Sequence, residues 1–135
     1  MVRYTFHKEE RLSSQKLIET MFVSGHSFLC YPLKVVYYTP DEPDVDSVLQ
    51  VGISVPKKNF KRAVKRNLLK RRIREAYRLH KHELYEYLAA TKQQVVIMFI
   101  YVGKEPLAYL KIEGGVKKAI SRLKKELGTG AENKA

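Results

Sequence analysis

The chain has 135 residues, of which 44% are hydrophobic, and this length is typical of one domain that folds without disulfides or a structural metal. Its one cysteine, Cys30, excludes an internal disulfide and suits a reducing compartment, where we expect it to be a small core residue. Because 26 Lys and Arg stand against 14 Asp and Glu, the formal net charge is +12, and such a balance favours a polyanionic partner.

The N-terminal part of the chain predicts a helix followed by strand. Ser14 can cap the helix and Gly25 can end it. The apolar face of the helix is formed by residues at helical spacing: Leu17, Ile18, Met21 and Phe22. Residues 28–39 are rich in Phe, Tyr and Val and predict strand, in which Pro32 either bends one strand or separates a short strand from a longer one.

An acidic segment separates this region from a second strand. Residues 40–47 (PDEPDVDS) lack the spacing and the glycine of an EF-hand calcium loop, so we interpret them as a solvated turn. Residues 48–55 predict another long strand. Together with residues 28–39, this strand suggests an antiparallel hairpin with a loop of moderate length.

The C-terminal half predicts a long helix, a buried strand and a last helix. The long helix covers roughly residues 62–88, and residues 94–102 are almost continuously apolar, as expected for a strand buried on both faces. The apolar stripe of the last helix consists of Val116, Ile120, Leu123 and Leu127. Gly114 and Gly115 make the start of this helix difficult to predict. Residues 128–135 are predicted to form a flexible tail. The element order predicts one domain over residues 1–135, an α+β sandwich with helices packed on one mixed sheet.

No segment predicts insertion into a membrane or secretion. The longest apolar run, residues 95–102, is far too short to span a bilayer, and residues 1–6 lack the apolar region of a secretory signal. We therefore expect a soluble, cytoplasmic protein without a membrane partner.

Nearly all of the excess positive charge lies in one stretch of the chain. Residues 57–81 hold 12 Lys and Arg and a single acid, Glu75, whereas the rest of the chain has 14 basic and 13 acidic residues. Along the predicted helix, a slowly winding cationic ridge is formed by residues four positions apart: Arg62, Arg66, Lys70, Arg74 and Arg78. Asn67, Arg71 and Lys81 project into the same broad sector.

The other side of this helix is expected to face the sheet. It carries the apolar residues Val64, Leu68, Leu69, Ile73, Ala76 and Leu79. Lys65 and Arg72 also fall within this side. Either their long stems run past the core to reach solvent, or Arg72 pairs with Glu75.

The charge pattern favours nucleic-acid binding over a solvated helix face. Solvated faces mix signs, whereas like charges four residues apart cost stability that a bound anion offsets. The predominance of Arg fits this reading, since guanidinium makes forked hydrogen bonds to phosphate and stacks on bases. A membrane-surface helix is less favoured, because the core needs the apolar side. If roughly 6 phosphates are contacted, the log–log salt slope of RNA affinity should be on the order of −4 to −5.

Residues 51–78, VGISVPKKNFKRAVKRNLLKRRIREAYR, resemble the signature of the bacterial ribonuclease P protein family. That signature is a strand ending in two lysines, a short link, and a helix with the pattern A-x-x-R-N-x-x-K-R-x-x-R-E. The matching residues are Lys57, Lys58, Ala63, Arg66, Asn67, Lys70, Arg71, Arg74 and Glu75. One departure is Leu68, which occupies the second arginine position of the family's R-N-R segment.

The resemblance implies both a fold and an activity. The implied fold has the order α-β-β-β-α-β-α and a left-handed crossover around the basic helix, like the second domain of ribosomal protein S5. The implied activity is that of a non-catalytic subunit of an endoribonuclease, a ribonucleoprotein that removes the 5′ leader of precursor tRNA. Ribonuclease P RNA would carry the chemistry together with most of the magnesium, while the protein alone would be a monomer without a cofactor.

The resemblance also implies two binding surfaces. The residues expected to bind the catalytic RNA are Lys57, Lys58, Lys61, Arg62, Lys65, Arg66, Asn67, Lys70, Arg71, Arg74 and Arg78. A cleft between the first helix and the sheet would hold the 5′ leader of precursor tRNA, and the corresponding positions are Ile18, Phe22, Lys34, Val36 and Tyr38. A purely core role for Ile18 and Phe22 is an equally supported alternative.

The residues predict neither a catalytic site nor a metal site in the protein. The most cationic element has only the carboxylate of Glu75, and His80 and His82 face different directions on a helix. Two alternatives stay open: a ribosomal or assembly protein on another RNA, and a sequence-specific DNA-binding protein. The motif spacing disfavours the first, and the length of the helix disfavours the second, which would need a short recognition helix, usually in a dimer.

Overall fold

The computed structural model describes residues 15–40 and 49–133. Its elements are α1 (Gln15–Ser24), β1 (His26–Cys30), β2 (Leu33–Tyr38), β3 (Leu49–Ser54), α2 (Ala63–Thr91), β4 (Val95–Tyr101) and α3 (Tyr109–Asn133). The predicted element order is confirmed, and Pro32 separates a short strand from a longer one. The predicted cap at Ser14 and most of the acidic segment 40–47 lie outside the described residues.

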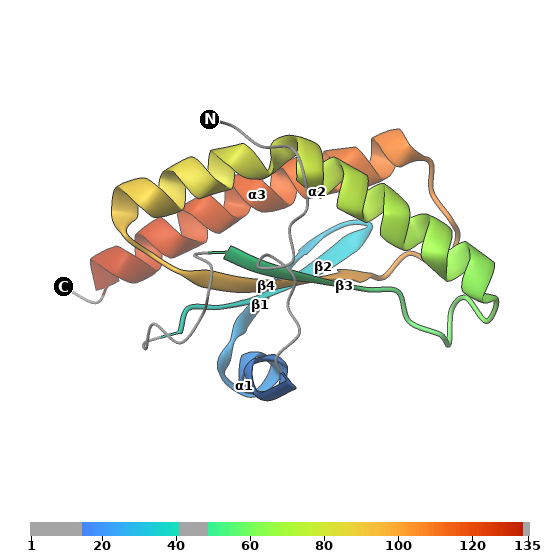
Figure 1. Cartoon of the computed structure of the whole chain (residues 1–135), viewed down its shortest axis with the longest axis horizontal. Helices are drawn as coiled ribbons and strands as arrows, with labels where there is room; N and C mark the ends of the chain where they lie inside the picture. Colours follow the sequence, from blue (N-terminus) through green and yellow to red (C-terminus); the bar gives the residue numbers. More distant parts are fainter. Residues whose placement is uncertain (1–14, 41–48, 134–135) are drawn as a thin grey trace.

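The helices form two layers around the sheet (Figure 1). α2 and α3 cover one face, and α1 lies against the other. The main core fills the space under α2 and α3 and includes Ile73, Tyr77, Phe99 and Ile120, all fully buried. A smaller cluster of Met21, Val36 and Val96 anchors α1 to the second face. Cys30 is half-buried and packs against the main core.

The sheet has the strand order β1-β2-β4-β3. β1 and β4 both pair antiparallel with β2, whereas β3 pairs parallel with β4. The predicted hairpin between the strands now seen as β2 and β3 is therefore wrong, because β4 lies between them. The reason is the composition of β4, VVIMFIY, which is apolar on both faces and so takes a central position.

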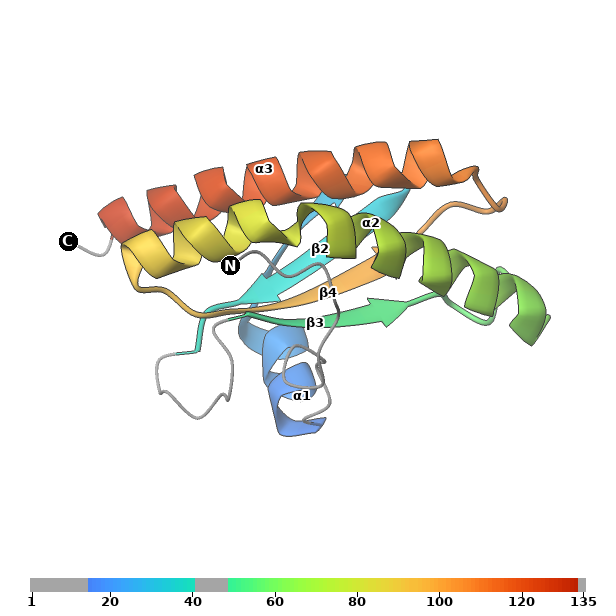
Figure 2. The same cartoon turned by 45° about the horizontal axis from the view of Figure 1, so that its top comes forward.

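The β3–α2–β4 crossover is left-handed, as the resemblance implied. In Figure 2 the helix layer is turned toward the viewer, β3 and β4 both point to the right, and β4 lies above β3. A crossover between neighbouring parallel strands is nearly always right-handed. The opposite sense therefore distinguishes this fold.

α3 starts earlier than the sequence indicates, and both Gly114 and Gly115 lie inside it. Gly115 is buried against the β1–β2 turn. A Cβ at Gly115 would lie 3.1 Å from Pro32 Cδ and 3.3 Å from the carbonyl oxygens of Cys30 and Tyr31. Glycine therefore permits a close approach of the helix to the turn at this position.

α3 continues past Gly128 to Asn133. A Cβ at Gly128 would lie 3.1 Å from the hydroxyl oxygen of Tyr87 on α2. This glycine lets two helices approach each other and does not end the helix.

The two neighbouring glycines of α3 provide a test of how the helix is seated. Gly114→Ala should raise the free energy of unfolding by about 0.5 to 1 kcal/mol, because alanine favours a helix interior and nothing lies within 4 Å of the added Cβ. Gly115→Ala gains the same propensity but must displace the turn, so it should be less stable than Gly114→Ala by about 1 kcal/mol or more. Urea unfolding measures both variants. Equal stabilities would contradict this seating of α3 on the turn.

Candidate nucleic-acid interface

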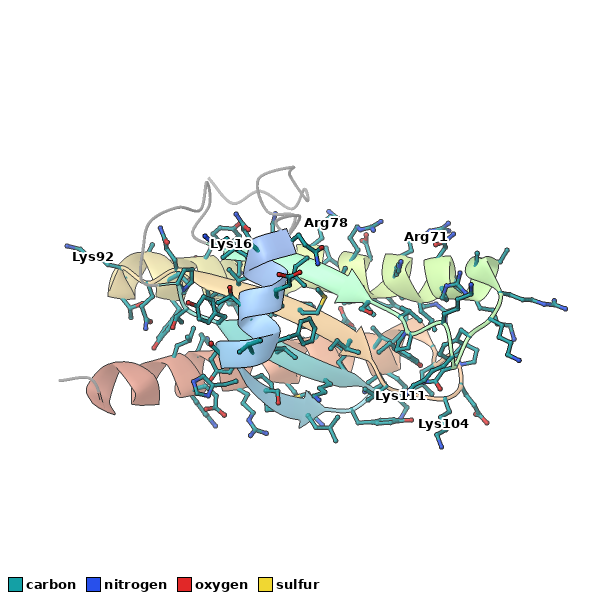
Figure 3. The ribbon with its side chains drawn as sticks, turned by 90° about the horizontal axis from the view of Figure 1, so that it is seen from below. Lys16, Arg71, Arg78, Lys92, Lys104 and Lys111 are labelled. Carbon is teal, nitrogen blue, oxygen red and sulfur yellow. The ribbon has the colours of Figure 1, made fainter. Side chains whose placement is uncertain are left out.

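The cationic residues of the β3–α2 link and of α2 are presented at the surface. Figure 3 shows Arg71 and Arg78 along the edge of the molecule that α2 forms. Of the predicted RNA-binding residues, the exposed ones are Lys57, Lys58, Lys61, Arg62, Lys65, Asn67, Arg71 and Arg74. The half-buried ones are Arg66, Lys70 and Arg78. The exposed members are the side chains available to an incoming anion.

The first turns of α2, residues 63–68, extend beyond the sheet (Figure 2), and we call them the α2 overhang. The first buried residue of α2 is Leu69. Val64 was predicted to face the sheet but is 78% exposed, because the overhang has no sheet beneath it. Lys81 is predicted to lie in the cationic sector, but its side chain is only 3% exposed because it lies on the inward face of the helix. Its Nζ lies 5.8 Å from the centroid of the Tyr85 ring.

Arg66 holds the entry to the helix. Its Nη1 donates to the carbonyl oxygens of Phe60, at 2.7 Å, and Lys61, at 2.9 Å. Arg62 occupies the N-cap position without a side-chain capping bond, so Arg66 provides the polar side-chain link between overhang and loop. Arg66 thus has a structural role in addition to the predicted RNA contact.

Arg72 resolves the alternatives left by the sequence. Its Nη1 donates to the carbonyl oxygen of Leu107 at 2.6 Å, so its stem runs past the core to the β4–α3 loop. Tyr101 fixes the same loop: its hydroxyl donates to the carbonyl oxygen of Glu105 at 2.6 Å and accepts from the amide of Leu107 at 3.0 Å. Burial raises the pKa of Tyr101, so its hydroxyl keeps its proton for this bond.

The fixed loop brings one cation to the basic surface that sequence reasoning missed. A hollow of about 370 Å³ is lined by Asn59, Phe60, Lys61, Arg62, Lys65, Lys104, Glu105 and Pro106. Lys104 thus faces three of the predicted RNA-binding residues across this hollow, although it lies far from them in sequence. Because Lys104 lies outside the basic stretch 57–81, nothing in the sequence indicated that it belongs to this surface.

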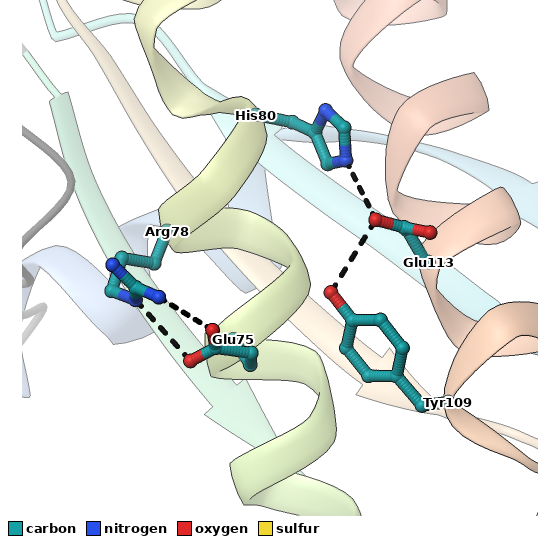
Figure 4. Close-up of polar contacts among 5 residues, drawn as sticks. All are labelled: Glu75, Arg78, His80, Tyr109 and Glu113. Atoms are coloured by element: carbon teal, nitrogen blue, oxygen red, sulfur yellow. Dashed lines mark hydrogen bonds and ion pairs between the residues drawn. The ribbon is translucent and has the colours of Figure 1, made fainter.

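Glu75 pairs with Arg78 and not with Arg72 (Figure 4). The distances are 2.5 Å from Arg78 Nη2 to Glu75 Oε1 and 3.2 Å from Nε to Oε2. The hydrogen bond from Arg78 holds the pKa of the Glu75 carboxyl below its ordinary value of 4.5. Since both groups are at the surface, the pair adds little stability, but it partly neutralises one member of the ridge.

A second polar cluster ties α2 to α3 (Figure 4). His80 Nε2 lies 3.0 Å from Glu113 Oε2, and the hydroxyl of Tyr109 donates to the same oxygen at 3.4 Å. The hydrogen bond from His80 is the main cause that lowers the pKa of Glu113. This histidine therefore joins α2 to α3.

The predicted leader-cleft residues lie on α1 or on β2, the strand that α1 contacts. Phe22 is 54% exposed and Lys34 is exposed, whereas Ile18 and Tyr38 are half-buried. Val36 is buried beneath Met21, so it supports α1 from below. Phe22 is therefore not a core residue.

Neither a metal site nor a membrane-spanning helix is found among the described residues. Within residues 15–40 and 49–133, no three His, Cys, Asp or Glu side chains gather where they could hold a metal ion. None of the helices in that part of the chain is long and apolar enough to cross a membrane.

The family model and the curated relatives that match this chain all describe the ribonuclease P protein. The Ribonuclease P family model matches residues 6–124. A ribonuclease P protein component of Porphyromonas gingivalis is 40% identical over 116 residues, which cover 86% of this chain and 84% of the relative. One from Chlorobium phaeobacteroides is 43% identical over 84 residues, covering 60% of this chain and 57% of the relative.

Solved structures show the same fold. A Staphylococcus aureus RNase P protein mutant with defective mRNA degradation activity has a TM-score of 0.67 at 25% identity, covering 87% of this chain and 90% of its own. The RNase P protein of Thermotoga maritima has a TM-score of 0.63 at 22% identity, covering 84% and 96%, which supports the fold alone.

The cluster between α2 and α3 predicts a pH-dependent contribution to stability. Because the pKa of Glu113 is lowered in the folded state, the contribution is present above its ordinary value of 4.5 and is lost as pH falls through the lowered folded pKa. Glu113→Gln should therefore lower the free energy of unfolding near neutral pH, and the difference from wild type should vanish in acid. Urea unfolding between pH 3 and 7 measures it.

His80→Ala provides the control for this test. In a His80→Ala background, Glu113→Gln should have a much smaller pH-dependent effect, because the main cause of the shift is gone and only the bond from Tyr109 and the charge of Lys117 remain. A difference between Glu113→Gln and wild type that stays constant down to pH 3 would contradict the assignment.

Proposed function

The chain belongs to the bacterial ribonuclease P protein family, and from this premise we propose that it works as the protein subunit of ribonuclease P in the maturation of tRNA 5′ ends. The observation that carries the proposal is the exposed cationic surface of α2, on which the family motif places its basic residues. Its partners are the catalytic RNA of ribonuclease P and precursor tRNA, and its site of action is the cytoplasm.

The basic surface of α2 supports docking on the catalytic RNA. Its exposed Lys and Arg side chains can each neutralise a phosphate and release counterions, which makes affinity strongly dependent on salt. Arg66 and Arg72 hold the helix entry and the neighbouring loop through backbone carbonyls, so the surface needs less ordering when RNA binds. Leu68 is half-buried, and Arg71, one turn of helix away, is an exposed cation close to it.

The division of labour in the complex follows the family resemblance. We assign phosphodiester hydrolysis to the RNA and its magnesium ions, and binding to the protein. A cationic surface lowers the repulsion between the phosphates of two RNA molecules, so it favours their association at low magnesium.

The face of the sheet beside α1 supports a role in holding the 5′ leader. Phe22 offers an exposed ring on which a base can stack, and Lys34 offers a cation to a neighbouring phosphate. Lys34 is paired in register with Ile100 on β4, whose side chain is half-buried at the same face. The leader would therefore cross β2 and β4 next to α1.

The proposed function is tested by 5′ processing of a precursor tRNA at low magnesium. The reactions contain protein alone, a bacterial ribonuclease P RNA alone, or both. Cleavage should occur only, or much faster, when both are present. Cleavage by the protein alone would place an active site in the protein, and no effect of the protein on a well-folded RNA would contradict the proposal.

Two variants of α2 extend this test to the RNA-binding surface. Arg71→Gln with Arg74→Gln removes two exposed cations, so the slope of log affinity for the RNA against log salt should decrease in magnitude by about 1.5 to 2. Stability in urea should stay within about 0.5 kcal/mol of wild type. Glu75→Gln should act in the opposite direction, because it releases Arg78 from its ion pair.

The leader cleft predicts a selective effect of Phe22. Phe22→Ala should weaken binding of precursor tRNA to the assembled complex by about 1 to 3 kcal/mol, the range for one base–aromatic stack, and leave binding of mature tRNA unchanged. Val23→Ala is the matched control, because Val23 is the next residue of α1 and is 85% exposed. Equal losses for both tRNAs, or for both variants, would argue against the cleft.

A further inference from the structure

α3 carries a second row of cations, which the proposed function does not use. The row, here called the α3 stripe, consists of Lys111, Lys118, Arg122 and Lys125, all exposed. At about 100° per residue, the four side chains fall within about 60° of one another around the helix. With a rise of about 1.5 Å per residue, the stripe is about 21 Å long.

Contacts place the α3 stripe above the β1 side of the sheet. The guanidinium carbon of Arg122 lies 4.7 Å from the centroid of the Phe28 ring on β1. Glu126 accepts from Arg122 Nε at 3.4 Å and from the hydroxyl of Tyr37 at 3.5 Å. Burial raises the pKa of the Cys30 thiol, while Arg122 and Lys118 act against that rise, as expected for two cations near the end of β1.

The α3 stripe and the basic surface of α2 lie on opposite sides of the molecule. α2 packs over β3 and α3 packs over β1 and β2, at the two ends of the strand order. Three strand spacings of about 4.8 Å separate β1 from β3, which is about 14 Å. Figure 3 shows Arg71 and Arg78 along one edge and Lys111 toward the other. One RNA strand lying along α2 therefore leaves the α3 stripe uncovered.

The composition of the α3 stripe differs from that of an ordinary solvated face. Lys118 and Arg122 are four residues apart and Arg122 and Lys125 three apart, so like charges are neighbours, and Glu126, which pairs with Arg122, is the acid beside them. The other exposed side of α3 mixes signs, with Glu113 one turn before Lys117. The repulsion within the stripe is the kind that a bound polyanion offsets.

The surroundings of the α3 stripe suit RNA. A hollow of about 510 Å³ is lined by Lys118, Ser121, Arg122, Lys125 and Glu126, so that three cations, a hydroxyl group and one carboxylate face one space. The cations and the hydroxyl group are of the kinds that commonly contact phosphate oxygens. In the turn packed against Gly115, Tyr31 is 62% exposed and provides a ring for base stacking.

We propose that the α3 stripe binds the sugar–phosphate backbone of a further segment of the catalytic RNA, separate from the segment that lies along α2. The proposal rests on the proposed function. α3 covers the same face of the sheet as α2, whereas the proposed leader cleft lies beside α1 on the other face, so the catalytic RNA is the source that the fold favours.

The experiment compares two matched pairs of substitutions on one helix. Lys118→Gln with Lys125→Gln removes two charges from the α3 stripe, and Lys117→Gln with Lys124→Gln removes two charges, at the same spacing, from the side facing α2. Arg122 is kept, because it covers Phe28. Salt dependence of affinity is measured for the catalytic RNA alone, and for precursor tRNA binding to the assembled complex.

The stripe variant should reduce the magnitude of the log–log salt slope by about 1.5 to 2, and the control pair by less than about 0.5. The loss should appear in the titration of the catalytic RNA alone, and a loss confined to precursor tRNA binding would contradict the assignment to the catalytic RNA. Equal losses for the two pairs, or none for the stripe variant, would overturn the proposal. If Arg71→Gln with Arg74→Gln weakens binding in that case, the proposed function stands and only the role of α3 fails.

Discussion

The burial of β4 on both faces is the constraint on which the rest of the molecule depends. Because β4 is apolar on both sides, it must lie inside the sheet, and it separates β2 from β3. α2 then has to connect β3 to a parallel neighbour by crossing one face of the sheet. That crossing sets α2 over the edge strand β3, where its inward residues complete the core and its outward residues meet solvent. The position of the cationic surface thus follows from the hydrophobicity of a strand that carries no charge.

The arginines of α2 have different tasks, although the sequence presents them as one series. Arg66 and Arg72 donate hydrogen bonds to backbone carbonyls and fix the two loops that flank the basic surface. Arg71 and Arg74 project from the fixed surface into solvent. Loops held in this way lose little freedom when a ligand binds, so more of the electrostatic attraction remains as affinity. The surface therefore depends on its carbonyl-bound arginines as well as on its exposed ones.

Periodicity and motif spacing were sufficient to predict the element order, the basic helix and the apolar stripe of α3, because each depends on residues close in sequence. The pairing of β2 with β4 could not be predicted in this way, since it depends on which strand is the most deeply buried. Val64 was misplaced because a helical projection does not show where the sheet ends, and Lys81 because the inward face extends further around the helix than assumed. The glycines of α3 resembled end signals, whereas Gly115 and Gly128 permit close packing. The sequence could not show whether the predicted cleft residues Ile18, Phe22 and Lys34 are buried, whereas the fold leaves Phe22 and Lys34 exposed and Ile18 half-buried.

The α2 overhang has a thermodynamic consequence. The overhang carries the cations Lys65 and Arg66 without a core beneath them, while the buried residues begin at Leu69. The overhang is therefore the segment of α2 expected to open first in native-state fluctuations. An anion that binds only the closed helix shifts this local equilibrium toward order by mass action. Recognition of the polyanion and completion of the helix are in this sense a single linked equilibrium.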